Sequence, residues 1–216
     1  MTDIAIYVEG GGDNIQQKTE LRQGLDALLR DVKSRAQAKR HGWKLVPCGG
    51  RNATYDAFVN ALRSAPAAVN VLLVDSEEAI ADETGDRMRA ARARVDHLTQ
   101  RDGWNLTAAD PERIHLMVQC MEAWIVADAD ALQRFYGQHF ARNALPARDN
   151  LEGESKRDVC GKLDRATADR RMTKGRYSKI KHASLLLQRL DPTKIVQRCP
   201  RFGTFTRWLT EAIDAC

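Results

Sequence analysis

The chain has 216 residues, of which 43% are hydrophobic and 29% are charged, the composition of an ordinary globular protein. No apolar run approaches the length of a membrane span and the first residues lack the features of a signal peptide, so we expect a cytoplasmic protein with no membrane partner. The five scattered cysteines form neither a disulfide framework nor a zinc-finger motif, and we expect them to be reduced.

The net charge of +5 is unevenly distributed along the chain. Residues 151–207 contain 15 Lys and Arg but 6 Asp and Glu, a balance of +9, so the remainder carries −4. This layout favours a basic part that contacts a polyphosphate backbone and an acidic part that holds metal. The alternative is a basic surface that only improves solubility.

The first third of the sequence predicts two strands, each followed by a glycine turn and a helix. The first strand spans residues 4–8 and ends at Glu9, and Asp13 or Asn14 caps a helix that ends near residue 41. The second strand spans residues 43–48, where Pro47 indicates a sheet edge or a strand end. A helix then runs as far as a proline at position 66.

The next strand is an apolar run over residues 71–74 that ends abruptly at Asp75, Ser76 and Glu77. Such a run is typical of a strand buried on both faces in a parallel sheet. If the chain stays extended, side chains at i and i+2 point the same way, so Asp75 and Glu77 can share one cation. Two hard oxygen ligands suit Mg²⁺ or Mn²⁺. An acidic loop over residues 78–85 and a helix over 86–100 follow.

A fourth strand over residues 114–118 leads into Glu122 and a helix that ends near residue 137. Alternation of strand and helix predicts an α/β fold with a mostly parallel four-stranded sheet flanked by helices. We assign residues 1–137 to this core. Residues 138–216, a polar linker and helices over 155–166, 178–190 and 204–215, form a basic helical extension packed on it.

A strand that ends in Glu-Gly, followed by a later strand that ends in Asp-x-Glu, resembles the Toprim domain of topoisomerases, primases and OLD-family nucleases. The resemblance covers roughly the first 135 residues and implies a Toprim/Rossmann-like fold. Residues 7–11, 121–124 and 177–182 more narrowly resemble a bacterial Toprim-like family of unknown function. The resemblance implies that Asp75 and Glu77 hold Mg²⁺ and that Glu9 is a ligand or a general acid/base. Glu122 would add a fourth catalytic carboxylate.

The same reading predicts residues that bind phosphate and nucleic acid. Glycine N–H groups after the first strand are open to a phosphate, and a guanidinium can grip two of its oxygens. A basic stretch with Tyr177 fits single-stranded nucleic acid, where the tyrosine stacks on a base. The alternatives are helix caps and ion pairs for the acids and for Arg51, and a plain helix residue for His182. The predicted binding residues are Gly10, Gly11, Arg51, Lys179, Lys181 and His182.

Together these features give the hypothesis of a Toprim-type nuclease that cleaves DNA or RNA with Mg²⁺ or Mn²⁺. The resemblance also implies a partner ATPase and a role in defence against phage. One alternative is a non-catalytic nucleic-acid or nucleotide-binding subunit of an ATPase-containing complex. Another is a phosphatase or nucleotidyl transferase, because one metal site serves several phosphoryl reactions.

Overall fold

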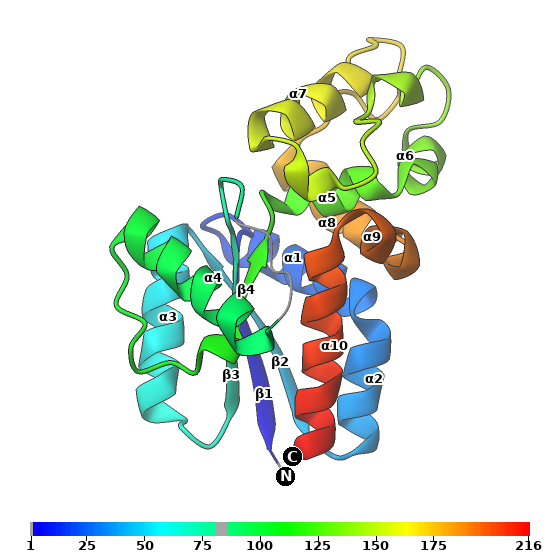
Figure 1. Ribbon diagram of the computed structural model, residues 1–216. Coiled ribbons are helices and arrows are strands. Elements are labelled where there is room, and N and C mark those ends of the chain that lie inside the picture. Colours follow the sequence, from blue (N-terminus) through cyan, green and yellow to red (C-terminus); the bar gives the residue numbers. More distant parts are fainter. Residues whose placement is uncertain (1, 81–85) are drawn as a thin grey trace.

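Four parallel strands form one sheet in the part of the chain that this computed structural model describes, residues 2–80 and 86–216 (Figure 1). The strand order is β2-β1-β3-β4, which places β1 and β3 side by side in the centre. The predicted α/β class and the four-stranded parallel sheet are thus confirmed. Part of the predicted acidic loop, residues 81–85, lies outside the described residues. The strands are β1 (Asp3–Glu9), β2 (Gly42–Gly49), β3 (Val69–Asp75) and β4 (Ile114–Met117).

Helices cover both faces of the sheet and bury two separate apolar cores (Figure 1). On β3, Val71 and Leu73 face the larger core while Leu72 and Val74 face the smaller one, and all four are fully buried. This alternation explains why the strand has no polar break. The smaller core is covered by α3 (Arg51–Ser64) and α4 (Arg87–Asp102), and the larger by α1 (Ile15–Leu28), α2 (Arg30–Ala38) and α10 (Pro200–Ala215).

The remaining helices lie beyond the carboxyl ends of the strands, and α10 returns from them along the sheet (Figure 1). The larger core continues from the sheet into these helices without interruption. One core thus spans residues 1–137 and the predicted helical extension, residues 138–216. Whether the two parts fold as separate units stays a prediction. These helices are α5 (Met121–Ala127), α6 (Ala129–Tyr136), α7 (Lys156–Ala166), α8 (Lys179–Leu187) and α9 (Pro192–Arg198), with 3₁₀ turns at Pro111–Arg113, Arg142–Ala144 and Leu151–Gly153.

Two predicted helices are each divided in the structure. The first breaks at Leu29 into α1 and α2, and the helix after β4 breaks at Asp128 into α5 and α6. Asp128 is fully buried, and its carboxylate accepts hydrogen bonds from the backbone N–H groups of Ala131 and Asp191 and from Lys194. At the break, Asp128 therefore caps the N-terminus of α6 and also binds Asp191 and Lys194, at the start of α9. Over residues 2–80 and 86–216, no helix has both the length and the apolar character needed to cross a membrane.

Candidate metal centre

Three carboxylates meet at the carboxyl edge of the sheet, and we call Glu9, Asp75 and Glu77 the acid cluster. Glu9 ends β1, Asp75 ends β3, and these two strands are neighbours. Each residue offers a carboxylate oxygen, and these atoms lie within 4.8 Å of one another. Parallel strands end at a common edge, which is where α/β sheets bind ligands. The structure thus brings together the three residues predicted as metal ligands.

Glu77 reaches the cluster by a different route from the one predicted. The strand ends at Asp75, and Glu77 has a φ of 67°, so the chain is not extended there. Its N–H instead donates to the carbonyl oxygen of Gln119 at 2.9 Å, which ties this turn to the segment after β4. A non-glycine residue in the left-handed region costs roughly 1–2 kcal/mol. The surrounding structure therefore holds the Glu77 carboxylate in place at an energetic cost.

Asp75 is the most buried member of the acid cluster, with 2% of its surface exposed. Its Oδ1 accepts a hydrogen bond of 2.9 Å from the backbone N–H of Met121, at the start of α5. Its Oδ2 faces two ammonium groups, Lys156 Nζ at 3.5 Å and Lys179 Nζ at 3.8 Å. Burial raises the pKa of Asp75 to about 7, and the negative charges of Glu9 and Glu122 add to the effect, while the two lysines oppose it.

Two lysines from the helices beyond the sheet complete the charge pattern. Lys156 Nζ lies 2.5 Å from Glu77, and Lys179 Nζ lies 3.5 Å from Glu122. Nearby carboxylates raise the pKa of both lysines against the opposing effect of burial, so both stay charged. Lys179 was predicted to bind phosphate, whereas Lys156 was not predicted as a site residue.

The placement of charge at helix ends is a sequence signal for Lys156 and Asp102, which were not predicted, as well as for Lys179, which was. Lys156 and Lys179 are the first residues of α7 and α8, and Asp102 is the last residue of α4. The helix macrodipole disfavours a cation at an N-terminus and an anion at a C-terminus. Charges in such positions indicate a tertiary partner of opposite sign, and each of these residues has one.

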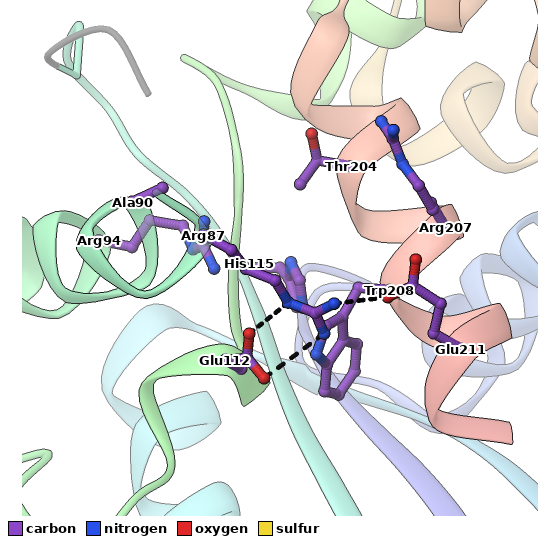
Figure 2. Close-up of a pocket in the computed structure, with 9 residues that line it drawn as sticks. All are labelled: Arg87, Ala90, Arg94, Glu112, His115, Thr204, Arg207, Trp208 and Glu211. Atoms are coloured by element: carbon purple, nitrogen blue, oxygen red, sulfur yellow. Dashed lines mark hydrogen bonds and ion pairs between the residues drawn. The ribbon is translucent and has the colours of Figure 1, made fainter. Parts of the chain in front are cut away.

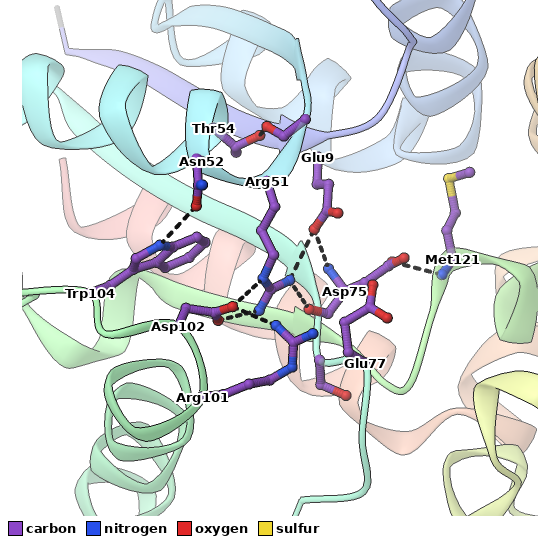
Figure 3. A network of polar contacts seen from close by, with 12 residues as sticks. Glu9, Arg51, Asn52, Thr54, Asp75, Glu77, Arg101, Asp102, Trp104 and Met121 are labelled. Atoms are coloured by element: carbon purple, nitrogen blue, oxygen red, sulfur yellow. Dashed lines mark hydrogen bonds and ion pairs between the residues drawn. The ribbon is translucent and has the colours of Figure 1, made fainter.

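Arg51 organises a polar network beside the acid cluster (Figure 3). It donates two hydrogen bonds to the carboxylate of Asp102, at 2.9 and 2.7 Å, one to Glu9 Oε2 at 3.1 Å and one to the carbonyl oxygen of Asp75. Its guanidinium also lies over the ring of Trp104. Four hydrogen bonds leave one of its five N–H groups, so the predicted phosphate clamp is wrong. The predicted alternative, an ion-pair partner of the acids, holds for Glu9.

The glycine turn after β1 supplies fewer free donors than predicted. Gly10 exchanges two backbone hydrogen bonds with Gly49, at 2.8 and 2.9 Å, so its N–H is not available to a phosphate. That part of the prediction is wrong. Gly11 has a φ of 86°, and a Cβ there would lie 3.0 Å from the backbone of Lys18, so the turn requires glycine. Within the described chain no backbone partner occupies the N–H of Gly11.

Glu122 lies outside the acid cluster, although it was predicted as a fourth catalytic carboxylate there. It groups instead with Cys120 and Cys160, whose sulfur atoms lie within 4.8 Å of it and of each other. We call these three residues the thiol cluster. Tyr177 donates its hydroxyl to Glu122 Oε1 at 3.1 Å and packs on the larger core, so its predicted stacking on a base is wrong.

The basic stretch around α8 is divided between two faces of that helix. Lys179 faces the acids, whereas Lys181 is exposed and lies two residues on, about 200° around the helix. His182 is 8% exposed, and its Nδ1 lies 3.0 Å from the Tyr136 hydroxyl and accepts the N–H of Ser178. Burial lowers its pKa, so it is a neutral core residue. The prediction that His182 binds nucleic acid is wrong, whereas phosphate binding by the exposed Lys181 stays a prediction.

Comparison with known proteins identifies the family of the chain. The family described as "Domain of unknown function (DUF4276)" matches residues 8–210. The chain belongs to this family. Neither a curated protein nor a solved structure matches it. The matched region contains the acid cluster, the thiol cluster and both lysines, so the family extends over the sheet and the helices beyond it. Its description names no activity, and the Toprim resemblance stays a prediction.

A divalent cation fits the donor set of the acid cluster. All three ligands are hard carboxylate oxygens, which Mg²⁺ and Mn²⁺ prefer. From the described residues Glu9 receives two hydrogen bonds, both at Oε2, so its Oε1 is left for a cation. Without a cation, the ammonium group of Lys156 neutralises Glu77 and part of the charge of Asp75. A cation would take over this role and free the lysines for an anionic substrate.

A cavity lies away from the acid cluster, between α4 and α10 (Figure 2). It measures about 390 Å³, and its lining includes His115 from β4 and Trp208 from α10. Arg87 crosses it in ion pairs with Glu112 and Glu211. Burial, followed by the charge of Arg94, lowers the pKa of His115 well below its usual value. None of the residues predicted from sequence lines this cavity.

Proposed function

We propose that the chain is a metal-dependent nuclease of the Toprim type, which hydrolyses phosphodiester bonds in DNA or RNA. The observation that carries the proposal is the convergence of Glu9, Asp75 and Glu77 within 4.8 Å at the carboxyl edge of the sheet. Lys156 and Lys179 place their ammonium groups beside this cluster. Carboxylates for a cation next to ammonium groups for a phosphate form the arrangement that phosphodiester hydrolysis needs.

Glu9, Asp75 and Glu77 would hold Mg²⁺ or Mn²⁺ through their carboxylate oxygens. The bound cation supplies charge neutralisation at the phosphate and lowers the pKa of a bound water. Arg51 fixes the orientation of Glu9 through Oε2, and Met121 N–H fixes Asp75 through Oδ1. Both contacts hold carboxylates in place before substrate binds, which lowers the cost of reaching the productive geometry.

Lys156 and Lys179 would bind the phosphate of the substrate. Each begins a helix, so the partial positive charge of the N-termini of α7 and α8 adds to the two ammonium groups. The fifteen cations of residues 151–207 support this less than their number suggests, because several are in ion pairs. Arg171 pairs with Asp169, and Arg176 pairs with Asp164. Lys156 and Lys179 are paired as well, but with the acids that a bound cation would neutralise, so these two lysines are the ones that metal binding would release for the substrate.

The main alternative is a non-catalytic nucleic-acid or nucleotide-binding subunit of an ATPase-containing complex. Its support is that the acids already have partners in the protein: Arg51 for Glu9, and Lys156 for Glu77. Such a network is stable without a cation and could serve only to hold the helices on the sheet. The resemblance to Toprim effectors extends the nuclease proposal to phage defence with an ATPase partner, and co-purification from the native host tests that extension.

Metal binding and cleavage, measured on the same samples, test the proposal. Calorimetric titration of Mn²⁺ and Mg²⁺ should give one strong site, and mixed single- and double-stranded DNA and RNA should be cleaved only with metal. Asp75→Ala/Glu77→Ala should weaken binding by at least about 100-fold and abolish cleavage, because two hard ligands are lost. Asp164→Asn, which removes an exposed acid, is the matched control and should retain both.

Circular dichroism shows whether each variant is folded. Cleavage that persists in the folded double variant would refute the proposal. Metal binding without cleavage of any of the four substrates would favour the binding-subunit alternative. If neither metal binds the wild type, the acids act only as ion-pair partners and the nuclease proposal fails.

A further inference from the structure

Cys120, Glu122 and Cys160 come together where two helices pack against each other. Cys120 precedes α5, Glu122 is its second residue, and Cys160 lies in the middle of α7. The two helices are in contact, and Cys120 is fully buried in the larger core. One ligand atom from each residue lies within 4.8 Å of the other two.

One oxygen of Glu122 lacks a hydrogen-bond partner in the described part of the chain. The residue is 2% exposed, and its Oε1 is taken up by the Tyr177 hydroxyl at 3.1 Å and by Lys179 at 3.5 Å. Oε2 is buried and has no hydrogen-bond partner among residues 2–80 and 86–216. Native structures rarely leave a buried carboxylate oxygen unsatisfied, since its desolvation is then uncompensated. A missing ligand at Oε2, next to two thiols, accounts for it.

The donor set selects the ligand. Two sulfurs and one carboxylate oxygen are poor ligands for Mg²⁺ but are typical of Zn²⁺. Two thiolates and a carboxylate carry a charge of −3, which Zn²⁺ and Lys179 together neutralise. Zinc–sulfur bonds of about 2.3 Å place the ligand atoms of a tetrahedral site roughly 3.3–3.8 Å apart. Because the ligand atoms lie within 4.8 Å of one another, zinc binding needs a contraction of about 1.5 Å at most.

We propose that the thiol cluster binds Zn²⁺, with the fourth position open to water, at a site separate from the acid cluster. Zinc binding would release the two thiol protons to solvent and would cross-link α5 to α7. These helices carry Met121, whose N–H holds Asp75, and Lys156, which contacts Asp75 and Glu77. The zinc would therefore fix the helices that position the acid cluster. The proposal does not depend on nuclease activity.

Cobalt(II) is the probe, because thiolate ligands give it a charge-transfer absorption that carboxylates cannot produce. The full chain, fully reduced and freed of metal, is titrated with Co²⁺ under argon and then with Zn²⁺ as competitor. One equivalent of Co²⁺ should produce the thiolate band together with the intense visible bands of four-coordinate cobalt, and Zn²⁺ should abolish them. Cys160→Ser should remove the thiolate band and weaken Zn²⁺ binding by at least about 100-fold.

Matched variants locate the site. Cys48→Ser removes a thiol that is half-buried, like Cys160, but lies outside the thiol cluster, and it should keep the full absorption. Glu122→Gln should keep part of the thiolate band and lower Zn²⁺ affinity by about 10–100-fold, because an anionic ligand becomes neutral. Asp75→Ala/Glu77→Ala should keep the band unchanged, so failure of the nuclease proposal would leave this one standing.

Four outcomes would overturn the proposal. The first is no thiolate band in wild type whose five thiols titrate as reduced. The second is a band that survives Cys160→Ser, and the third is a band lost in Cys48→Ser with an unchanged circular dichroism spectrum. Formation of a disulfide between Cys120 and Cys160, with no metal binding by the reduced chain, would also contradict it.

Discussion

Removal of the Arg51 guanidinium should destabilise the protein far more than removal of an arginine at its surface. The Arg51 side chain is 14% exposed and links α3 to three other elements, through Asp102 at the end of α4, Glu9 at the end of β1 and the carbonyl oxygen of Asp75. In Arg51→Ala, the carboxylates of Asp102 and Glu9 would lose their main counter-charge. Their side chains are 10% and 18% exposed, so water replaces little of it.

The loss of stability in Arg51→Ala can be estimated from the burial of its ion pairs. Breaking a buried ion pair by removing one partner costs about 3–5 kcal/mol, because the remaining charge stays buried. Arg101 also pairs with Asp102 at 2.5 Å and compensates in part, so we expect the lower end, about 3 kcal/mol. For a chain of this length, that corresponds to a decrease in Tm of about 6–12 °C. In Arg51→Ala/Asp102→Asn the two effects should fall short of additivity by about 1–3 kcal/mol.

Urea unfolding followed by circular dichroism measures these free energies. The control is Arg35→Ala, since Arg35 also grips an aspartate, Asp214, with two hydrogen bonds of 2.8 and 2.6 Å, but both side chains are exposed to solvent. Solvent screening should make its effect much smaller. Equal losses in Arg51→Ala and Arg35→Ala would refute the argument from burial. Additivity of Arg51 and Asp102 within about 0.5 kcal/mol would refute the direct coupling.

Two further predictions concern residues outside the metal centre. The pKa of His115 is lowered in the folded state, so the unfolded chain binds its proton first and stability falls as the pH drops below about 6.5, by up to about 1.4 kcal/mol per pH unit. His115 lies in the cavity of Figure 2, and His115→Gln should make the free energy of unfolding depend less on pH between pH 7.5 and 5. An unchanged pH dependence would contradict the attribution to His115. Gly24→Ala should destabilise by about 1–2 kcal/mol despite the better helix former, because its Cβ would lie 2.8 Å from the carbonyl oxygen of Ser184. At Gly161 the nearest atom to an added Cβ is Arg165 Nη1 at 3.9 Å, an ordinary contact, so Gly161→Ala should be neutral or stabilise by up to about 1 kcal/mol. Similar changes in stability for the two variants would count against the close helix contact at Gly24.

The sequence alone determined the sheet and the acids at its edge. Uninterrupted apolar runs over residues 71–74 and 4–8 require strands buried on both faces, and strand–helix alternation requires those strands to be parallel. Parallel strands end at one edge, so Glu9 and Asp75 had to lie near each other once the two strands paired. Local pattern and chirality were sufficient for this because neither depends on distant contacts.

Tertiary structure alone decided which charges and thiols meet the acids. Arg51 was predicted to grip a phosphate, yet it is held by Asp102, which follows it by 51 residues. Lys156 reaches Asp75 from α7, and Cys160 reaches Cys120 across forty residues of sequence. Such contacts depend on how α5, α7 and α8 pack beyond the sheet, which hydrophobic periodicity does not specify. The sequence indicates such contacts only where a charge opposes the helix dipole, as Lys156 does at the start of α7 and Asp102 at the end of α4. A charge in such a position requires a partner of opposite sign elsewhere in the fold.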